Sequence, residues 1–534
     1  MRWRRADPRF ALAFALLVAA PARAQSPTPN ASDSPCSSCQ GPLRTWGTGE
    51  EAEVSPLEPA PPSEPEVPAP RAEPARDPST PIRYVLDAIQ VSGNVRTQRR
   101  VILALLPFRP GDRLDVQDTR LRNARFRLLG TGFFHDVSLS LRRGRARGRA
   151  VLVVTVRERS TVRVNDVWLG VSADAEVDGR ARPLTAYGGL DVAETNLLGT
   201  GISLGGAAAV ADRQLALRTR VLDPALLGSS FAVYGELLYA AARDFFGQRD
   251  VQLAAPSGSI PVDYAVVSYK RFGGVLGAGH ELGSPRSRLF AELHLESLAA
   301  DLPRGATHVR GGQVVPLSYG LEPGASVYSS LRASYVYDAR DRPMLATRGA
   351  RIGVSAEGSP KLISDYAFAK LQARAEYNFP VWGEHVLRLE AFAGAIVGDA
   401  PLFLRYYIGD FSDLLPDRVL ELNVDRRPAP NVFGTAIREV RYGVYAGRVQ
   451  AEYRVPLFRG RRSVYGVDAF ASLGLYAVAD RQDVTRPAAG YRGLAKVPAD
   501  MTFNLGMRAD TALGAMTLGI STLIGFLPLR RGEP

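Results

Sequence analysis

The most constraining feature of this chain is a repeated alternation of apolar and polar residues with a period of two. The clearest example runs from Leu371 to Phe379, where Leu, Ala, Ala, Tyr and Phe alternate with Gln, Arg, Glu and Asn. The pattern returns from Val449 to Val455 and, less regularly, in most segments after residue 160. A soluble antiparallel sheet with one wet face produces the same alternation, so only the number of such segments favours a wall between lipid and a wet lumen. We therefore expect a mainly β fold, a transmembrane antiparallel β-barrel.

The first residues carry the pattern of an export signal. Four arginines precede the apolar stretch Phe10 to Ala20, and Ala22-Arg23-Ala24 before Gln25 is a small-x-small cleavage pattern. We interpret residues 1–24 as a signal peptide and expect the protein to leave the cytoplasm. Residues 25–81 are dominated by Pro, Ser, Ala and Glu, a composition that cannot bury a core, so we expect a disordered tether.

Both cysteines of the chain lie in this tether. Cys36 and Cys39 lack the folded context of a redox centre and the two further ligands of a zinc site. A local disulfide in an oxidising compartment is the simpler interpretation. We expect no cofactor and no metal.

Residues 82–160 carry almost all of the net charge of the chain. They contain 17 Arg against 5 Asp and 1 Glu, a net of +11 (17 − 6) out of +12. Five of these arginines crowd one turn and are called the hairpin arginines: Arg142, Arg143, Arg145, Arg147 and Arg149. An exported domain rarely meets nucleic acid, so the alternatives are contact with anionic lipid headgroups and a solvated basic face without a specific partner.

The pattern of residues 82–160 predicts a small α+β domain. A strand from Tyr84 to Val91 precedes a helix that Thr97 can cap, and a second helix opens near Asp118. Two strands follow, of which the nearly all-apolar one, Val151 to Val156, should be central. The strand before it, near His135 to Leu141, should then form an exposed edge.

The same residues resemble the POTRA domain, the periplasmic module of BamA-like outer-membrane assembly proteins. The resemblance covers everything after residue 81, so the implied fold is one POTRA domain (82–160) followed by an outer-membrane barrel (161–534) of about sixteen strands whose first and last strands meet at a weak seam. It rests on these segments: IQVSGNVRT, LPFRPGDRLDVQD, LLGTGFFHDVSLSL, VTVRER, ETNLLGTGISL, VLDPALLGS, YDARDRPMLATRG, FLRYYIGD, EYRVPLF and FNLGMRADTALG.

One of these segments has a direct physical interpretation. Asp338, Arg340 and Asp341 lie where a strand should end, Pro343 opposes further strand pairing, and Gly349 opens the next strand. We expect these charges to brace a periplasmic turn.

The chain departs from the family at the loop that folds into the barrel. The family carries an Arg-Gly-aromatic turn whose arginine reaches an acidic residue on the wall, whereas this chain reads DFSDLLPDR and has Ser472 where the family usually has aspartate. Losing both partners is physically more coherent than leaving one charge isolated. Asp468 with Arg418 or Arg441 can form a relocated lumenal latch, although an ordinary lumenal charge pair is the better interpretation.

The sequence offers no catalytic constellation, so we do not expect an enzyme. The five histidines are scattered, and no nucleophile elbow or phosphate loop is present. Two functions compete: insertion of client proteins into the outer membrane of a Gram-negative bacterium, with strand pairing at the POTRA edge and the barrel seam, and secretion of one dedicated partner. A structural barrel without transport is the third. The expected partners are outer-membrane lipid, an unfolded β-barrel or secreted client, and periplasmic accessory proteins.

Overall fold

The structure is a computed structural model. It describes residues 83–172, 185–226, 229, 231–246, 251–253, 265–303, 305–310, 313–342, 344–407, 418–420, 422–423, 442–460, 463–481 and 499–524. The expected signal peptide, the expected tether and the Cys36–Cys39 pair lie outside these residues. The α+β domain and the barrel belong to one compact unit, Asp77–Pro534.

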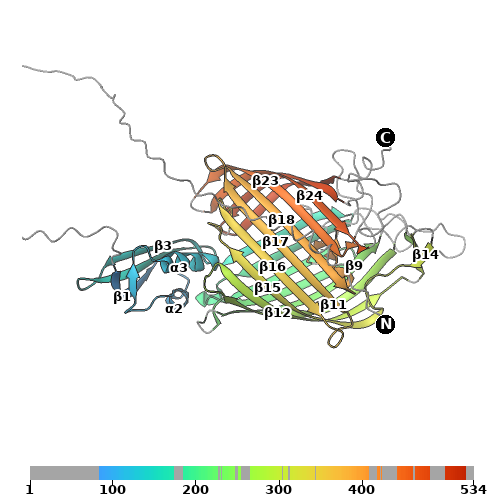
Figure 1. The fold of residues 1–534 in the computed structure, drawn as a ribbon, viewed down its shortest axis with the longest axis horizontal. Coiled ribbons are helices and arrows are strands. Elements are labelled where there is room, and N and C mark those ends of the chain that lie inside the picture. The colour runs from blue at the N-terminus through green and yellow to red at the C-terminus, as the bar shows by residue number, and fades with distance from the viewer. Residues whose placement is uncertain are drawn as a thin grey trace, which may run out of the picture. The chain divides into compact units, whose positions relative to one another are not determined.

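The first part of the described chain is a small α+β domain (Figure 1). Its sheet has the order β2-β1-β4-β3, with β1 and β4 parallel. Parallel neighbours need a crossover, and the two helices lie within it. Its elements are β1(Arg83–Ser92), α2(Arg99–Ala104), β2(Arg113–Asp115), α3(Thr119–Gly130), β3(Phe134–Arg143) and β4(Arg149–Glu158).

The apolar residues of both helices and the sheet form one core, which includes Leu86, Ile102, Leu128 and Leu152. The expected central and edge positions of the last two strands are confirmed by the sheet order. The expected cap of the first helix is wrong. Helix α2 begins at Arg99 with Gln98 at the cap position, and the Thr97 hydroxyl accepts a hydrogen bond from Asn196 Nδ2 at 2.8 Å instead of capping the helix.

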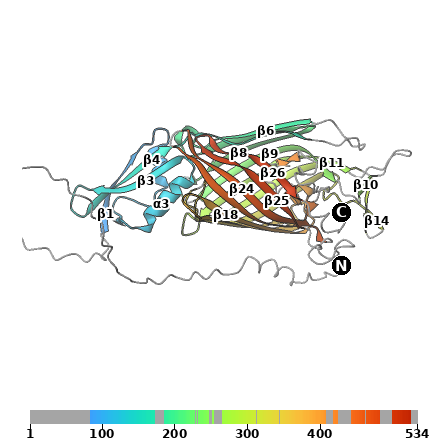
Figure 2. The ribbon, with the colours of Figure 1, turned by 90° about the horizontal axis from the view of Figure 1, so that it is seen from above.

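The second part is a barrel wall of fifteen strands among the described residues, every neighbouring pair of which is antiparallel. Figure 1 shows the strands β12 to β24 side by side, and Figure 2 shows β26 with β25 and β24. In chain order the wall strands are β5(Val162–Ser172), β6(Thr185–Glu194), β7(Ser203–Ala211), β8(Gln214–Asp223), β9(Phe231–Phe246), β11(Ala265–Glu281), β12(Ser287–Asp301), β15(Gly324–Asp338), β16(Gly349–Ser359), β17(Phe368–Pro380), β18(Val386–Gly398), β23(Tyr445–Arg459), β24(Val464–Ala479), β25(Ala499–Thr511) and β26(Gly514–Ile524).

Burial in this wall is the reverse of that in a soluble protein. On β25, Asn504 is fully buried whereas its neighbour Leu505 is 51% exposed, and on β11 Arg271 is 3% exposed whereas Phe272 is 63% exposed. Polar side chains therefore point into the lumen and apolar side chains point outward, as the strands of a membrane barrel require. The described helices are too short or too polar to span a membrane.

Several short elements accompany the wall. The short strands β10(Val251–Leu253), β13(Ala306–Arg310) and β14(Gln313–Pro316) form a small sheet of their own. A 3-10 turn η1(Leu197–Gly199) follows β6. Between β18 and β23 lie η3(Leu402–Leu404), β19(Tyr406–Tyr407), β20(Arg418–Val419), β21(Leu422–Asn423) and β22(Tyr442–Gly443).

Candidate functional site

The first candidate site is the seam between β5 and β26, the two edges of the barrel wall. The fifteen wall strands of the described residues are joined by antiparallel pairs, so both edges run in the same direction and β5 and β26 cannot close as an ordinary antiparallel pair. The resemblance implies about sixteen strands, and the described residues contain one fewer. The relative direction of the two edges depends on whether the number of wall strands is odd or even. The alternation of residues does not encode this parity.

The seam is joined at its base. Among the described residues one backbone hydrogen bond crosses it, from Val164 N to Leu513 O at 2.8 Å. Gly514 follows with a φ of +135°, and a Cβ there would lie 2.5 Å from Val164 O. Glycine is therefore required where β26 starts against β5. Farther along both edges, Leu169 and Leu518 point their side chains outward and are largely exposed.

The second candidate site is the free edge of β3 in the α+β domain. Gly144 N donates to Arg149 O at the hairpin, so the even-numbered residues of β3 pair with β4 and the odd-numbered ones turn their backbone groups to the edge. At Val137 this edge is covered, because Arg125 Nε donates to Val137 O at 2.9 Å and Val137 N donates to Asp136. The open part of the edge therefore begins at Leu139.

Side chains of the α+β domain contact the turns of the barrel. Arg159 binds the Asp510 carboxylate with two hydrogen bonds, at 2.9 and 3.2 Å, and lies over the ring of Tyr465. His135, at the start of the edge strand, stacks on the same ring with centroids 3.8 Å apart. Burial and the nearby Arg159 lower the pKa of His135, so it is neutral at pH 7.

A second set of contacts reaches the end of β11 and the turn after β6. Arg127 of α3 binds Glu281 at the end of β11, and Asn196 Nδ2 donates to Thr97 Oγ1 at 2.8 Å. Gly199, in η1, approaches the backbone so closely that a Cβ would lie 2.2 Å from Arg96 O. The α+β domain is thus held against the turns at this end of the barrel at several points, and His135 is the contact made by β3 itself.

The charges predicted to brace a turn lie between β15 and β16. Arg340 donates to both carboxylate oxygens of Asp338, at 3.0 and 2.8 Å, and lies 3.5 Å from Glu376. Asp341 accepts hydrogen bonds from Thr347 N and from the Thr347 hydroxyl. Gly349 has a φ of +105°, and Pro343 lies outside the described residues. The proposed bracing is compatible with this geometry.

The residues of the predicted latch are only partly described. Asp468 is buried and binds Arg459 at 2.6 Å, with Arg454 at 3.8 Å. Arg441 and the side chain of Arg418 lie outside the described residues, so the latch stays a prediction. Ser472 accepts a hydrogen bond from Asn504 at 2.8 Å, which satisfies this buried hydroxyl without a charged partner.

The described residues 402–407 and 442–443, between β18 and β23, are held inside the lumen by residues that sequence reasoning missed. Tyr442 donates to Asp244 on β9 at 2.7 Å, and Tyr269 on β11 donates to the same carboxylate at 2.6 Å. Arg271 lies over the ring of Phe403 at 3.8 Å and is paired with a glutamate. We call residues 402–407 and 442–443 the lumenal segment. Only the charged Asp244 beside Phe245 and Phe246 hints at this contact in the sequence.

The five hairpin arginines are all exposed at the β3–β4 turn. Arg142 donates to Gln90, and Arg149 lies 3.2 Å from Asp87. The Arg145 backbone amide and Arg149 lower the pKa of Asp87. Lipid contact by this turn stays a prediction.

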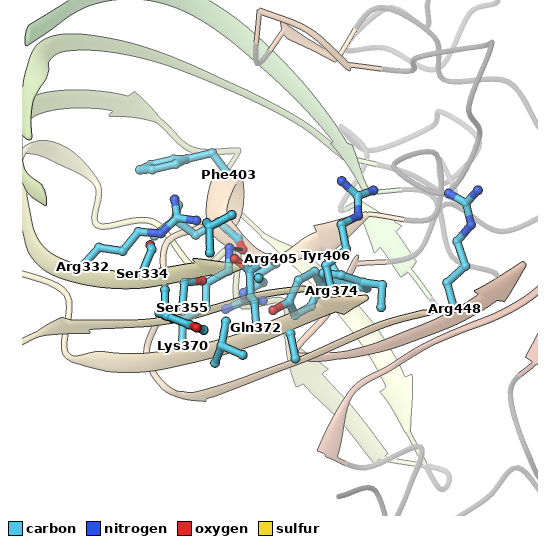
Figure 3. Close-up of a pocket in the computed structure, with 17 residues that line it drawn as sticks. Arg332, Ser334, Ser355, Lys370, Gln372, Arg374, Phe403, Arg405, Tyr406 and Arg448 are labelled. Carbon is cyan, nitrogen blue, oxygen red and sulfur yellow. Dashed lines mark hydrogen bonds between the residues drawn. The ribbon is translucent and has the colours of Figure 1, made fainter. Parts of the chain in front are cut away.

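A cavity of about 430 Å³ lies in the lumen between the wall and the lumenal segment (Figure 3). Its wall side comes from β15, β16, β17, β18 and β23, and its inner side from residues 403–406. Lys370 Nζ donates to Leu404 O at 2.9 Å and so joins the two sides. Among the described residues, no group of three or more His, Cys, Asp or Glu is placed to hold a metal ion.

Comparison with known families agrees with this architecture. Residues 196–414 match the Omp85 superfamily domain, and residues 84–159 match a POTRA domain described as a surface antigen variable number repeat. The chain contains an Omp85 superfamily domain. Members of this superfamily are transport and assembly proteins of the outer membrane. In this Omp85 protein the seam strands β5 and β26 both lie outside the matched range.

Solved structures resemble the chain at low sequence identity. CdiB from Escherichia coli has a TM-score of 0.55 at 12% identity, covering 83% of this chain and 73% of that chain. BamA from Haemophilus ducreyi lacking POTRA domains 1–3 has a TM-score of 0.45 at 15% identity, covering 83% and 81%. CdiB from Acinetobacter baumannii has a TM-score of 0.46 at 13% identity, covering 83% and 74%. No curated protein sequence matches the chain.

Proposed function

We propose that this Omp85 protein inserts β-strand-forming client proteins into the outer membrane at the β5–β26 seam. The observation that carries the proposal is the pair of edges running in the same direction. One incoming strand that runs antiparallel to both edges can form an antiparallel ladder with each of them. The two edges cannot form such a ladder with each other, because they run in the same direction.

The base and the upper part of the seam have different roles in this proposal. The hydrogen bond between Val164 and Leu513 and the close approach at Gly514 keep the edges together at the base. Above the base, unpaired backbone groups of the edges face each other and are costly in lipid. A client strand that satisfies these groups is therefore stabilised by the exposed edges.

The POTRA edge supplies the first pairing step. The outward backbone groups of Leu139 and Leu141 accept an extended client strand, while Arg125 and Asp136 cover Val137 and set where pairing begins. We place this domain in the periplasm, with the barrel in the outer membrane of a Gram-negative bacterium. The domain division we propose is residues 1–24, 25–81, 82–160 and 161–534, and periplasmic accessory proteins are further partners.

The alternative is a secretion pore for one dedicated partner, favoured by the likeness of the fold to CdiB. A pore needs an open lumen, and here Tyr407 and Tyr442 are buried within the lumen beside Asp244. Secretion would therefore require displacement of the lumenal segment, whereas insertion at the seam would not. A structural barrel without transport needs neither movement.

The test locks the seam. In a chain whose two native cysteines are replaced by serine, cysteines at Val164 and Leu513 close the base, and cysteines at Leu169 and Leu518 are joined by a short thiol-reactive crosslinker. Insertion of a barrel client into liposomes is followed by the heat-modifiable migration of the folded client on gels. We expect the upper crosslink to stop insertion and cleavage of a reducible crosslinker to restore it.

A control pair lies within the closed wall. Val354 and Ala373 are register partners on β16 and β17, so a disulfide there constrains two strands that stay paired. This variant should insert clients at the unmodified rate. Equal insertion by the seam-locked and reduced proteins would refute the seam mechanism and leave secretion or a structural role.

A further inference from the structure

A linker of three residues joins the α+β domain to the barrel at the base of the seam. It consists of residues 159–161, which lie between the end of β4 and the start of the seam strand β5. The carbonyl of Thr161 accepts two hydrogen bonds from Thr195, one from the backbone amide at 2.8 Å and one from the hydroxyl at 2.9 Å. Thr195 directly follows β6, so the linker is fixed on the β5–β6 side of the seam.

The side chain of Arg159 reaches from this linker to the other side of the seam. Its guanidinium donates to both carboxylate oxygens of Asp510, at 2.9 and 3.2 Å, and to the Thr511 carbonyl at 3.4 Å. Both acceptors lie at the end of β25, which pairs with the seam strand β26. Arg159 and Asp510 are only 11% and 13% exposed, so water weakens this ion pair less than it weakens a surface pair. Arg163, on β5 itself, is also attracted to this carboxylate.

The α+β domain is attached to the β5–β12 side of the seam through its backbone as well as its side chains. The Gln98 backbone amide donates to Gly199 O at 3.0 Å, in the turn after β6. The Asn196 side chain of the same turn donates to the Thr97 hydroxyl. A backbone hydrogen bond and a buried side-chain contact therefore hold the domain on this side.

The domain contacts the β24–β25 side through side chains. Arg159 makes the ion pair with Asp510 and lies over the ring of Tyr465, and His135 stacks on the same ring. The two sides of the seam are thus bridged by one domain with unequal attachments. Of the contacts on the β24–β25 side, the ion pair of Arg159 is the one that starts in the linker and ends beside β26.

We propose that Arg159 is a releasable clasp that holds the β25–β26 hairpin against β5. It acts together with the backbone hydrogen bond from Val164 to Leu513, which crosses the seam at the same base. When the ion pair breaks, the domain stays attached beside β6, and the β25–β26 hairpin is free to move away from β5. The consequence for clients rests on the proposed function of the seam: release of the clasp gives a client strand access to the base.

The test follows amide hydrogen exchange, resolved to single residues, in the full-length protein in nanodiscs. The Val164 amide reports on the base, because it donates across the seam. Its exchange should be about tenfold faster in Arg159→Gln, since hydrogen bonds to a charged acceptor are lost. Arg159→Lys should give a smaller increase, because it keeps the charge and loses the paired planar donors. Asp510→Asn should give at least the effect of Arg159→Gln, since it also removes the attraction to Arg163.

Arg127→Gln is the matched control. It breaks an ion pair of the same type between the domain and Glu281, which lies at the end of β11 and does not cross the seam. Exchange at Val164 should be unchanged in this variant. The Gln98 amide is the second reference, and it should keep its protection in Arg159→Gln because the domain stays attached beside β6. Heat-modifiable migration on gels shows that the barrel of each variant is folded.

Faster exchange at Val164 in Arg159→Gln, with no change in Arg127→Gln, supports the clasp. Equal exchange at Val164 in the unmodified protein and in Arg159→Gln overturns it. An equal increase in both variants also overturns it, because the effect then belongs to docking of the whole domain, as does loss of protection at Gln98 in Arg159→Gln. The measurement contains no client, so a failure of client insertion at the seam leaves this result unaffected.

Discussion

Removal of the Tyr442 hydroxyl should release the lumenal segment from the barrel wall. Tyr442 donates to Asp244 at 2.7 Å, and this carboxylate is only 2% exposed. A hydrogen bond to a charged acceptor contributes about 1.5–3 kcal/mol. Tyr442→Phe should therefore raise the population of the undocked segment about 10- to 150-fold, while the ring keeps its contact with Tyr407, 5.0 Å away between centroids.

The measurement is amide hydrogen exchange in the full-length protein. The amides of Tyr442 and Gly443, in the short ladder with Tyr406 and Tyr407, should lose protection by the same factor. Tyr269→Phe is the matched control, because it removes the other hydroxyl from the same carboxylate, between the wall strands β9 and β11, and keeps the ring that lies beside Phe403. Unchanged protection in Tyr442→Phe, or equal loss in both variants, would refute the role of Asp244 as the anchor of the segment.

Two further predictions concern the POTRA domain. Burial would raise the pKa of Glu158, but hydrogen bonds from Thr97, Arg96 and Val95 outweigh it and lower the pKa below its ordinary value of 4.5. The stabilisation of the folded domain by the Glu158 carboxylate is present above pH 4.5 and is lost as the pH falls through the folded pKa. Protection of these three amides, measured by amide hydrogen exchange, should therefore decline as the pH is lowered. In Glu158→Gln the protection should be weak at every pH. A pH-independent result in the unmodified protein would contradict this. Replacing three of the hairpin arginines by Glu should weaken binding of the protein to anionic vesicles at low salt and have little effect at high salt. The binding is measured by co-sedimentation. Equal binding before and after the replacement would show that the turn is a solvated basic face without a lipid partner.

The sequence by itself determined the local character of this protein. The alternation from Leu371 to Phe379 is confirmed as strand β17, with Leu371 exposed and Glu376 buried. The edge and central positions of β3 and β4 also followed from their own residues. These features depend on neighbours close along the chain, where side-chain period and turn residues decide the backbone conformation.

Only the tertiary structure decided how distant parts meet. Tyr442 and Asp244 are 198 positions apart, and neither residue type signals such a contact. The parity of the wall strands, and with it the common direction of β5 and β26, depends on every pairing around the barrel. The lumenal cavity likewise exists only when the lumenal segment folds back on the wall strands, among them β15, β17 and β23. Periodicity assigns each residue to one face of its own strand, whereas closure of the sheet decides which residues of distant strands lie close together.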